Sequence, residues 1–338
     1  MALTVAACAM FVTPCYGKNC GVVKSEESKI DTLSYALGAN MGTSIKQQFA
    51  DIALNVGVVI KGMDDALNGK MSQSHDEVVA MLREFFGNTL NERNQAYQEA
   101  KKADSTLVFN AFADAAECDK ISYAFGNDIG CNVKKSNLPI QQYWLLAGLK
   151  EAWSGNSKLS PEEVTAYLNH YFTVVRPAEM ALRSAAWLAE KEKEEGVRKT
   201  ESGLLYKVVV VGDMSKAAKS DEDIVKVHYV GRKQDGTVFD SSRFEYRSKE
   251  QQETMRKHNP ELFDANGVIL KNDPIEFPLN RVIKGWTEGM MLIGPGGKIV
   301  LYIPAELAYG SAGAGDVVGP NEALEFEVEL LEVTPAAK

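Results

Sequence analysis

Two stretches of the chain carry apolar residues at every fourth position, with polar residues between them. The positions are Leu33, Leu37, Met41 and Ile45 in the first stretch, and Ile121, Phe125, Ile129 and Val133 in the second. A spacing of four places such residues on one face of a helix, where they form an apolar stripe. The pattern therefore predicts two helices, and each has a face that another part of the protein must cover.

The residues around these stripes also repeat. The segment that begins Asp31-Thr-Leu-Ser-Tyr-Ala returns 88 residues later as Asp119-Lys-Ile-Ser-Tyr-Ala. The segment that begins at Gly62 returns 86 residues later at Gly148. Recurrence at a nearly fixed distance indicates two related helical units.

Each copy continues with a signal for the start of a further helix. Ser74 and Ser160 precede acidic residues, and this combination is typical of the amino-terminal cap of a helix. The sequence predicts long helices over residues 76–117, with a break near Asp104, and over residues 162–195, with a kink near Pro177. Below, residues 25–117 are the first repeat and residues 118–199 are the second repeat.

After residue 200 the apolar period changes from four to two. Segments 204–211 and 223–230 are rich in β-branched residues, and in the last segment Leu324, Phe326, Val328 and Leu330 alternate with glutamates. Alternation of this kind is typical of a strand with one buried face. Residues 281–291 fit a short helix that crosses one face of the sheet. The predicted fold class is therefore α+β, with an all-helical amino-terminal region followed by an antiparallel β-sheet wrapped around a short helix.

Composition then narrows the classes of function. The 338 residues include 37 basic and 46 acidic side chains, so the formal net charge is -9. Such a chain has no global attraction for nucleic acid or anionic lipid, and no nucleic-acid partner is expected. Its four His and five Cys provide no CxxC pair and no His pair at a metal-binding helical spacing. We therefore expect no metal site and no cofactor.

The segment 1–24 is signal-like. Its apolar stretch, residues 2–12, is too short to cross a bilayer but suits the core of a secretory signal, although no basic segment precedes it. A disordered tail is the alternative. Cys8 ends a Val-Ala-Ala-Cys sequence that resembles a lipoprotein processing site. We expect an exported protein, periplasmic or associated with the outer membrane and without a transmembrane helix, whose cleavage and lipidation stay open.

Two further cysteines, Cys118 and Cys131, lie far from this segment. An oxidising compartment would permit a disulfide between them. Two buried free thiols are the alternative, because unpaired cysteine is among the most buried residue types.

Five ordered segments of the carboxy-terminal region, residues 200–338, resemble one family. They are Val227-His-Tyr-Val-Gly231, Asp235-Gly-Thr-Val-Phe-Asp-Ser-Ser242, Val282-Ile-Lys-Gly-Trp-Thr-Glu-Gly289, Ile303-Pro-Ala-Glu-Leu-Ala-Tyr-Gly310 and Leu324-Glu-Phe-Glu-Val-Glu-Leu330. A single short motif can match by chance, but chance agreement of five segments in the same order is negligible. The region resembles the FKBP-type peptidyl-prolyl cis-trans isomerases. The two repeats resemble the helical dimerisation region of the macrophage-infectivity-potentiator and periplasmic FKBP group.

The resemblance implies an apolar pocket with Trp286 as its floor. The residues that it places around the floor are Tyr229, Phe239, Val282, Ile283 and Phe326, with Tyr309 and Val318 on a flexible wall. It also implies that the Ile283 backbone N–H and the Tyr309 hydroxyl bind substrate carbonyls, while Asp240 lies beside the twisting amide. Taken singly, the apolar residues are most often ordinary core, and Asp240 is equally suited to stabilising a turn.

The chain also departs from the family pattern. Ile275, which the resemblance places beside the substrate, stands where the family usually has an aromatic residue on the strand before the Trp286 helix. Ala314 stands where the family has a His. Residues 243–273 replace a short flap, and they are either a lid or client-contact surface or a tolerated surface excursion. The basic partner of Asp240 is ambiguous between Arg243 and Arg247.

The implied activity is isomerisation of the peptide bond before proline in unfolded or partly folded exported polypeptides. This reaction needs an apolar pocket and one or two polar groups, and it needs no nucleophile or metal. The alternative is a non-catalytic chaperone or scaffold that binds proline-containing or unfolded clients. The resemblance also implies macrolide inhibitors and a homodimer through the helical region. Whether the repeats pair within one chain or between two chains stays open.

Overall fold

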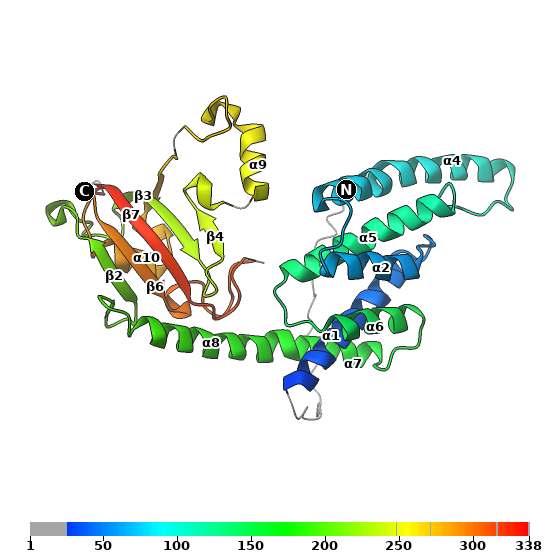
Figure 1. Ribbon diagram of the computed structural model, residues 1–338, viewed down its shortest axis with the longest axis horizontal. Coiled ribbons are helices and arrows are strands. Elements are labelled where there is room, and N and C mark those ends of the chain that lie inside the picture. Colours follow the sequence, from blue (N-terminus) through cyan, green and yellow to red (C-terminus); the bar gives the residue numbers. More distant parts are fainter. Residues whose placement is uncertain (1–25, 248, 271, 316, 337–338) are drawn as a thin grey trace. The chain divides into compact units, whose positions relative to one another are not determined.

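The computed structural model describes residues 26–247, 249–270, 272–315 and 317–336 (Figure 1). The chain divides into two compact units between Phe172 and Thr173. The signal-like segment 1–24 and its Cys8 lie outside the described residues. None of the described helices is long and apolar enough to cross a membrane.

The amino-terminal unit is all helical, as both repeats predict. Its helices are α1 (Glu26–Gln48), α2 (Val56–Leu67), α3 (His75–Glu84), α4 (Leu90–Ala103), α5 (Ala115–Lys135), α6 (Gln142–Trp153) and α7 (Pro161–His170). The π-helical turns η1 (Phe85–Thr89) and η2 (Tyr171–Val175) follow α3 and α7. The caps are confirmed, because the side chains of Ser74 and Ser160 each accept a hydrogen bond from the backbone N–H of the third helical residue.

Helices of one repeat pair with helices of the other. The most extensive helix contacts join α1 to α6 and α2 to α5. Leu33 of the first stripe and Phe125 of the second are fully buried. Gly38 and Gly126 permit the close approach, because a methyl group at either position would collide with a backbone carbonyl of the opposite helix. The predicted helices are confirmed, and five of the eight stripe residues are buried while Met41, Ile129 and Val133 are partly buried.

In the helix predicted over residues 76–117, the break near Asp104 is confirmed, but the continuation beyond it is wrong because residues 104–114 are not helical. Helix α4 ends at Ala103, and a new helix, α5, begins at Ala115. Asp104 turns the chain, because its carboxylate accepts hydrogen bonds from the backbone N–H and the hydroxyl of Thr106. Side-chain bonds of this local kind compete with the hydrogen bonds that would continue a helix.

The two cysteines on α5 are free thiols. The Cys118 thiol donates a hydrogen bond to the Ala53 carbonyl, and the Cys131 sulfur lies 3.3 Å from the Met71 sulfur. Both are only partly buried. Of the two alternatives, the structure contains the free thiols.

The carboxy-terminal unit contains α8 (Arg176–Lys191), which begins at the interruption predicted near Pro177 and ends one turn before residue 195. Its strands are β1 (Arg198–Lys199), β2 (Leu205–Val210), β3 (Ile224–Arg232), β4 (Val238–Ser241), β5 (Ile275–Pro278), β6 (Lys298–Ile303) and β7 (Leu324–Thr334). They form one antiparallel sheet in the order β1-β2-β6-β7-β3-β4, and β5 also pairs with β3. With the helical unit, this sheet confirms the α+β class.

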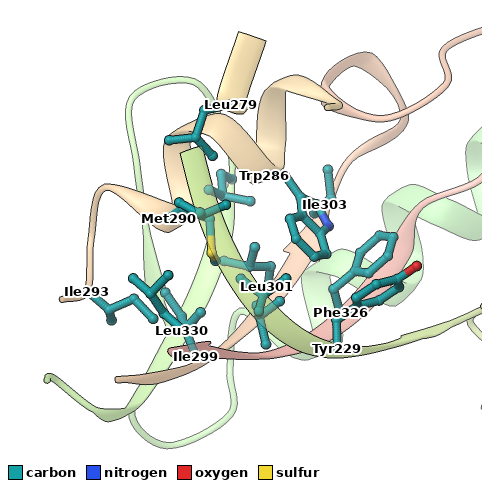
Figure 2. Close-up of a cluster of buried hydrophobic side chains, with 14 of the residues drawn as sticks. Tyr229, Leu279, Trp286, Met290, Ile293, Ile299, Leu301, Ile303, Phe326 and Leu330 are labelled. Carbon is teal, nitrogen blue, oxygen red and sulfur yellow. The ribbon is translucent and has the colours of Figure 1, made fainter. Parts of the chain in front are cut away.

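The core of this unit gathers side chains from the sheet and from helix α10 (Lys284–Met290) (Figure 2). In β7, Leu324, Phe326, Val328 and Leu330 are buried whereas Glu327 is exposed. The predicted alternation is therefore confirmed. Helix α10 packs against β6, which is the crossing that the pattern of residues 281–291 predicts.

Residues 243–273 form an insertion with η4 (Phe244–Tyr246), α9 (Lys249–His258) and η5 (Pro260–Leu262). Phe244 is buried, and its ring centroid lies 5.0 Å from that of Phe263. The Arg256 guanidinium lies over both rings. The insertion therefore has a small apolar centre of its own.

Candidate functional site

Helix α10 carries Trp286, the predicted floor of the pocket. The helix lies close to the sheet because two of its glycines face β6. A methyl group at Gly285 would collide with Ile303, and one at Gly289 would collide with Leu301. The two glycines therefore set the height of the Trp286 indole above the sheet.

Aromatic rings enclose this indole, which is only 4% exposed (Figure 2). Tyr229 from β3, Phe326 from β7 and Phe277 from β5 each meet it edge to face, with centroid distances of 5.2, 5.4 and 5.9 Å. Edge-to-face pairs contribute about 0.5–1.5 kcal/mol each beyond the area that they bury. Rings from three strands thus hold the indole in one orientation.

Phe277 is a residue of this cluster that the sequence does not single out. It lies two positions after Ile275 on β5, so both side chains project from the same face of the strand. Its ring contacts those of Trp286 and Tyr229, with centroid distances of 5.9 and 6.3 Å. The short alternation on β5 is the signal that could have identified it.

The other predicted neighbours lie at the edge of the core. These partly buried residues, which pack against the core cluster, are Phe239, Ile275, Val282 and Ile283. Phe239 meets Phe326 edge to face, with the centroids 5.6 Å apart. A partly exposed set of apolar side chains next to a buried indole suits an apolar ring as ligand.

Asp240 lies on β4 and is exposed. Its carboxylate accepts a 2.6 Å hydrogen bond from the Tyr229 hydroxyl. Burial, reinforced by this bond and by the charge of Asp240, raises the pKa of Tyr229 well above its usual range. The adjacent turn is bonded by Ser241 and Ser242, whose hydroxyls donate to the Tyr229 carbonyl. The Asp240 carboxylate is therefore oriented by Tyr229, and the hydroxyls of Ser241 and Ser242 make the hydrogen bonds of the turn.

Tyr309 and Val318 lie in the connection between β6 and β7. Val318 is 2% exposed, and paired backbone hydrogen bonds of 2.8 and 3.2 Å join it to Ala314. Tyr309 is 38% exposed. Burial, and then the charge of Asp240, raises the pKa of the Tyr309 hydroxyl. Tyr309 therefore keeps its proton at neutral pH and can donate a hydrogen bond.

The backbone of Ile283 offers a second donor. Its carbonyl accepts hydrogen bonds from the N–H groups of Trp286 and Thr287, whereas its own N–H has no acceptor among the described residues. Most backbone N–H groups in folded proteins are paired. This amide, on a partly buried residue next to α10, is available to a ligand.

The two arginines that were candidates for the partner of Asp240 have different surroundings. The Arg243 guanidinium forms a 2.6 Å ion pair with Glu329. The charge of Arg247 acts on Tyr229, where it lowers the pKa and opposes part of the rise. The Arg247 Nε is buried and unpaired among the described residues. Arg243 is thus paired with Glu329, whereas Arg247 acts on the ionisation of Tyr229.

Two hollows among the described residues lie in the amino-terminal unit instead. One of them, of about 580 Å³, is lined mainly by amide, aromatic and aliphatic side chains of α4 and of the loops around it. Nor do any three His, Cys, Asp or Glu side chains of the described ranges lie together as metal ligands. The site at Trp286 is identified by its side-chain chemistry and its unpaired amide rather than by depth.

Two family models match the chain. Residues 215–331 match the FKBP-type peptidyl-prolyl cis-trans isomerases. Residues 30–116 and 118–208 each match the domain amino-terminal to FKBP-type peptidyl-prolyl isomerase. The second model thus matches once in each repeat.

Curated proteins with similar sequences carry names of the same family. The FKBP-type 22 kDa peptidyl-prolyl cis-trans isomerase of Escherichia coli K12 is 36% identical over 220 residues, which cover 63% of this chain and 93% of its own. FkpA of the same strain is 32% identical over 72% of this chain and 84% of its own. Outer membrane protein MIP of Legionella longbeachae is 32% identical over 65% and 87%. A crystal structure of Escherichia coli FkpA, also 32% identical, covers 67% of this chain and 100% of its own with a TM-score of 0.39. The chain belongs to the FKBP-type peptidyl-prolyl cis-trans isomerases.

Proposed function

We propose that the site at Trp286 catalyses cis–trans isomerisation of peptide bonds that precede proline. One arrangement supports this most directly. The enclosed indole follows the Ile283 amide, which has no acceptor among the described residues, and the partly exposed Tyr309 hydroxyl is close enough to Asp240 to feel its charge. An apolar ring on the indole, with its flanking carbonyls at these donors, is the binding mode of an X-Pro segment.

The reaction is slow in water because rotation breaks the resonance of the amide, with a barrier of about 18–20 kcal/mol. A catalyst must therefore bind the twisted amide more tightly than either planar form. In the proposed complex, apolar residues at the rim exclude water, which stabilises the polar planar amide more than the twisted one. Asp240, oriented by Tyr229, lies beside the rotating bond and favours the orientation in which the carbonyl oxygen points away from it.

NMR exchange between the cis and trans forms of a short X-Pro peptide, measured with the full chain, tests the proposal. We expect Trp286→Leu to lower kcat/KM at least about tenfold, a loss of about 1.4 kcal/mol of transition-state binding. The matched control is Trp153→Leu in α6, because the first repeat carries Leu67 at the corresponding position. Exchange no faster with the protein than without it would overturn the proposal.

We further propose that the substrates are proline-containing segments of unfolded or partly folded polypeptides and that macrolide inhibitors compete for the same site. The apolar rim and the two donors support both ideas. Inhibition by a macrolide that weakens in Trp286→Leu is the expected result. The homodimer implied by the helical resemblance has less support, since the described helices cover their stripes within one chain.

We propose that the protein acts outside the cytoplasm. The apolar stretch at residues 2–12 supports export, and one relative is named an outer membrane protein. Fractionation of cells that express the full chain is expected to recover it from the periplasm or with the outer membrane. Cys8→Ser is expected to release a membrane-bound fraction if Cys8 is lipidated, and recovery from the cytoplasm would contradict export.

A client-binding role of the insertion is a second candidate. Its apolar residues Tyr246, Val268 and Leu270 are 41%, 60% and 66% exposed. Exposed apolar side chains in one segment are typical of interaction surfaces. Suppression of the aggregation of an unfolded protein should survive Trp286→Leu and be lost when Val268 and Leu270 are both changed to Ser. Loss with Trp286→Leu alone would assign binding to the pocket.

A further inference from the structure

Hydrogen bonds between the two repeats occur in corresponding pairs. The Tyr35 hydroxyl donates to Glu151 at 2.7 Å, and the Tyr123 hydroxyl donates to Asp65 at 2.8 Å. Tyr123 lies 88 residues after Tyr35, and Glu151 lies 86 residues after Asp65, which are the offsets of the sequence repeat. The same contact is therefore made twice, once in each direction between the repeats.

A second pair of bonds follows the same rule. The hydroxyl of Ser34 accepts a 2.7 Å hydrogen bond from the Gln141 N–H, and the hydroxyl of Ser122 accepts a 2.9 Å hydrogen bond from the Asn55 N–H. Ser122 corresponds to Ser34, and Gln141 corresponds to Asn55. Both serines are fully buried, so each bond pairs a buried hydroxyl oxygen of one repeat with a backbone N–H of the other, and an unpaired buried polar group would reduce stability.

The close backbone approaches are reciprocal as well. A methyl group at Gly38 would collide with the carbonyl of Leu145, and one at Gly126 would collide with the carbonyl of Val59. Leu145 is the counterpart of Val59 in the sequence repeat. Contacts in which i meets j and the counterpart of j meets the counterpart of i are those of an isologous twofold interface.

We propose that the repeats arose as copies of one unit and form, within a single chain, the interface that two separate units would form. The chain is therefore a monomer built as a quasi-dimer. Five of the eight stripe residues, Leu33, Leu37, Ile45, Ile121 and Phe125, are at most 7% exposed, and Met41, Ile129 and Val133 are partly buried, so the repeats cover most of each other's stripe. In the second repeat, α7 and η2 are followed directly by α8 and the isomerase unit, whereas in the first repeat α4 ends at Ala103 and the chain continues into α5. A single isomerase unit thus follows two helical repeats in the chain.

Light scattering of the full chain at micromolar concentration, under reducing conditions, is the first test. We expect the monomer mass of 37.0 kDa. Twice that mass would overturn the proposal, because the stripes would then be covered between chains.

A nicked chain gives the second test. A site for a specific protease is inserted between Ser105 and Thr106 in the full chain, at the exposed turn that follows α4 within the first repeat, so that cleavage separates α1–α4 from the rest of the chain. After cleavage, the two fragments should elute together in native size exclusion and separate only in denaturant, because each stripe is covered by the other fragment. Fragments that separate under native conditions would overturn the proposal.

An independent observation concerns Ser184, in the middle of α8 and 5% exposed. Its hydroxyl donates to the Asn321 carbonyl at 2.7 Å and accepts from the Ala323 N–H at 2.9 Å and from the Gln234 side chain at 2.6 Å. A serine hydroxyl has one donor and two acceptor positions, so all three are used. Helix α8 is thus bonded to the segment just before β7.

That segment is bonded in turn to the wall of the site. The Asn321 N–H donates to the carbonyl of Gly310, the residue after Tyr309, at 2.9 Å. Asn321 has a left-handed backbone with φ +58°, which is uncommon for a residue other than glycine. Its side chain donates to the Pro177 carbonyl at the start of α8. Two bonds from the helix therefore hold the backbone that carries Tyr309.

We infer that Ser184 is a positioning residue for the pocket wall and that α8 is a functional part of the isomerase domain, which would extend the expected 200–338. This inference rests on the proposed isomerase activity. Ser184→Ala should raise KM for X-Pro peptides about three- to tenfold with little change in kcat, because it displaces the Tyr309 donor without removing it. Arg183→Ala, exposed on the same helix, is the control.

The outcomes separate the two ideas. An inactive wild-type chain contradicts the proposed function. An active wild type with an unchanged KM in Ser184→Ala, or with equal losses in kcat and in folded fraction, contradicts only the positioning role.

Discussion

At the scale of single residues, the hydrogen bond from Tyr229 to Asp240 links the aromatic floor to the charged edge of the site. Removing the hydroxyl in Tyr229→Phe keeps the ring against Trp286 but leaves the carboxylate free to rotate. We expect kcat/KM to fall about three- to tenfold and the free energy of unfolding to fall by about 1 kcal/mol. Peptide exchange and urea unfolding measure the two effects. Tyr206→Phe is the control, and an unchanged kcat/KM would contradict a role for the oriented carboxylate.

The protonation of the two tyrosines gives a prediction about pH. Burial raises the pKa of both Tyr229 and Tyr309 above that of a free tyrosine, about 10. Both should therefore remain protonated donors, and kcat/KM should stay level from about pH 6 to about pH 10. Above that range stability should decline, because the unfolded tyrosines lose their protons at a lower pH than the folded ones. A fall in kcat/KM near pH 8 would contradict this account.

The sequence predicts some residues of the cluster better than others. Trp286, Tyr229 and Phe326 lie in segments with strong motifs, and the structure brings them together. Phe277 has no motif, and its place becomes clear only when β5 is paired with β3. The ion pair of Arg243 was equally hidden, because Glu329 is far along the chain and reaches it only through sheet pairing.

At the scale of elements, the closeness of α10 to β6 places the indole. Gly285→Ala would push its methyl group into Ile303 and lift the helix. We expect a loss of about 1–3 kcal/mol in the free energy of unfolding, as for overpacked cores, together with a fall in kcat/KM. Lys284→Ala, exposed on the same helix, should change neither. Full stability in Gly285→Ala would show that Ile303 can move aside.

Periodicity predicted most elements, because each one buries a regular stripe. The break near Asp104 was predicted but its length was not, because the bonds from Thr106 to Asp104 act locally and the next helix begins only at Ala115. Nor does a stripe identify the surface that covers it. The pairing of α1 with α6 and of α2 with α5 depends on contacts between distant segments, and no local pattern contains that information.

At the scale of the whole molecule, the two compact units should unfold separately. Domains with their own cores are expected to give separate transitions. Calorimetry of the full chain should show two unfolding transitions. A ligand of the isomerase site should raise the midpoint temperature of only one of them, because at a concentration of 100 Kd it adds about 2.7 kcal/mol to the free energy of unfolding of that unit. Trp286→Leu should abolish that shift and leave the other transition unchanged. A single transition that moves as a whole would contradict independent units.

The paired contacts of the helical unit have a consequence for how it can change. In a symmetric dimer of identical chains, every substitution enters both halves of the interface at once. Here Glu151 opposes Tyr35 while Asp65 opposes Tyr123, and Trp153 occupies the position that corresponds to Leu67. Because both halves are encoded in one chain, each side can be altered without the other. The helical unit is thus free to become asymmetric, with one half adapted to carry the catalytic domain and the other to a different task.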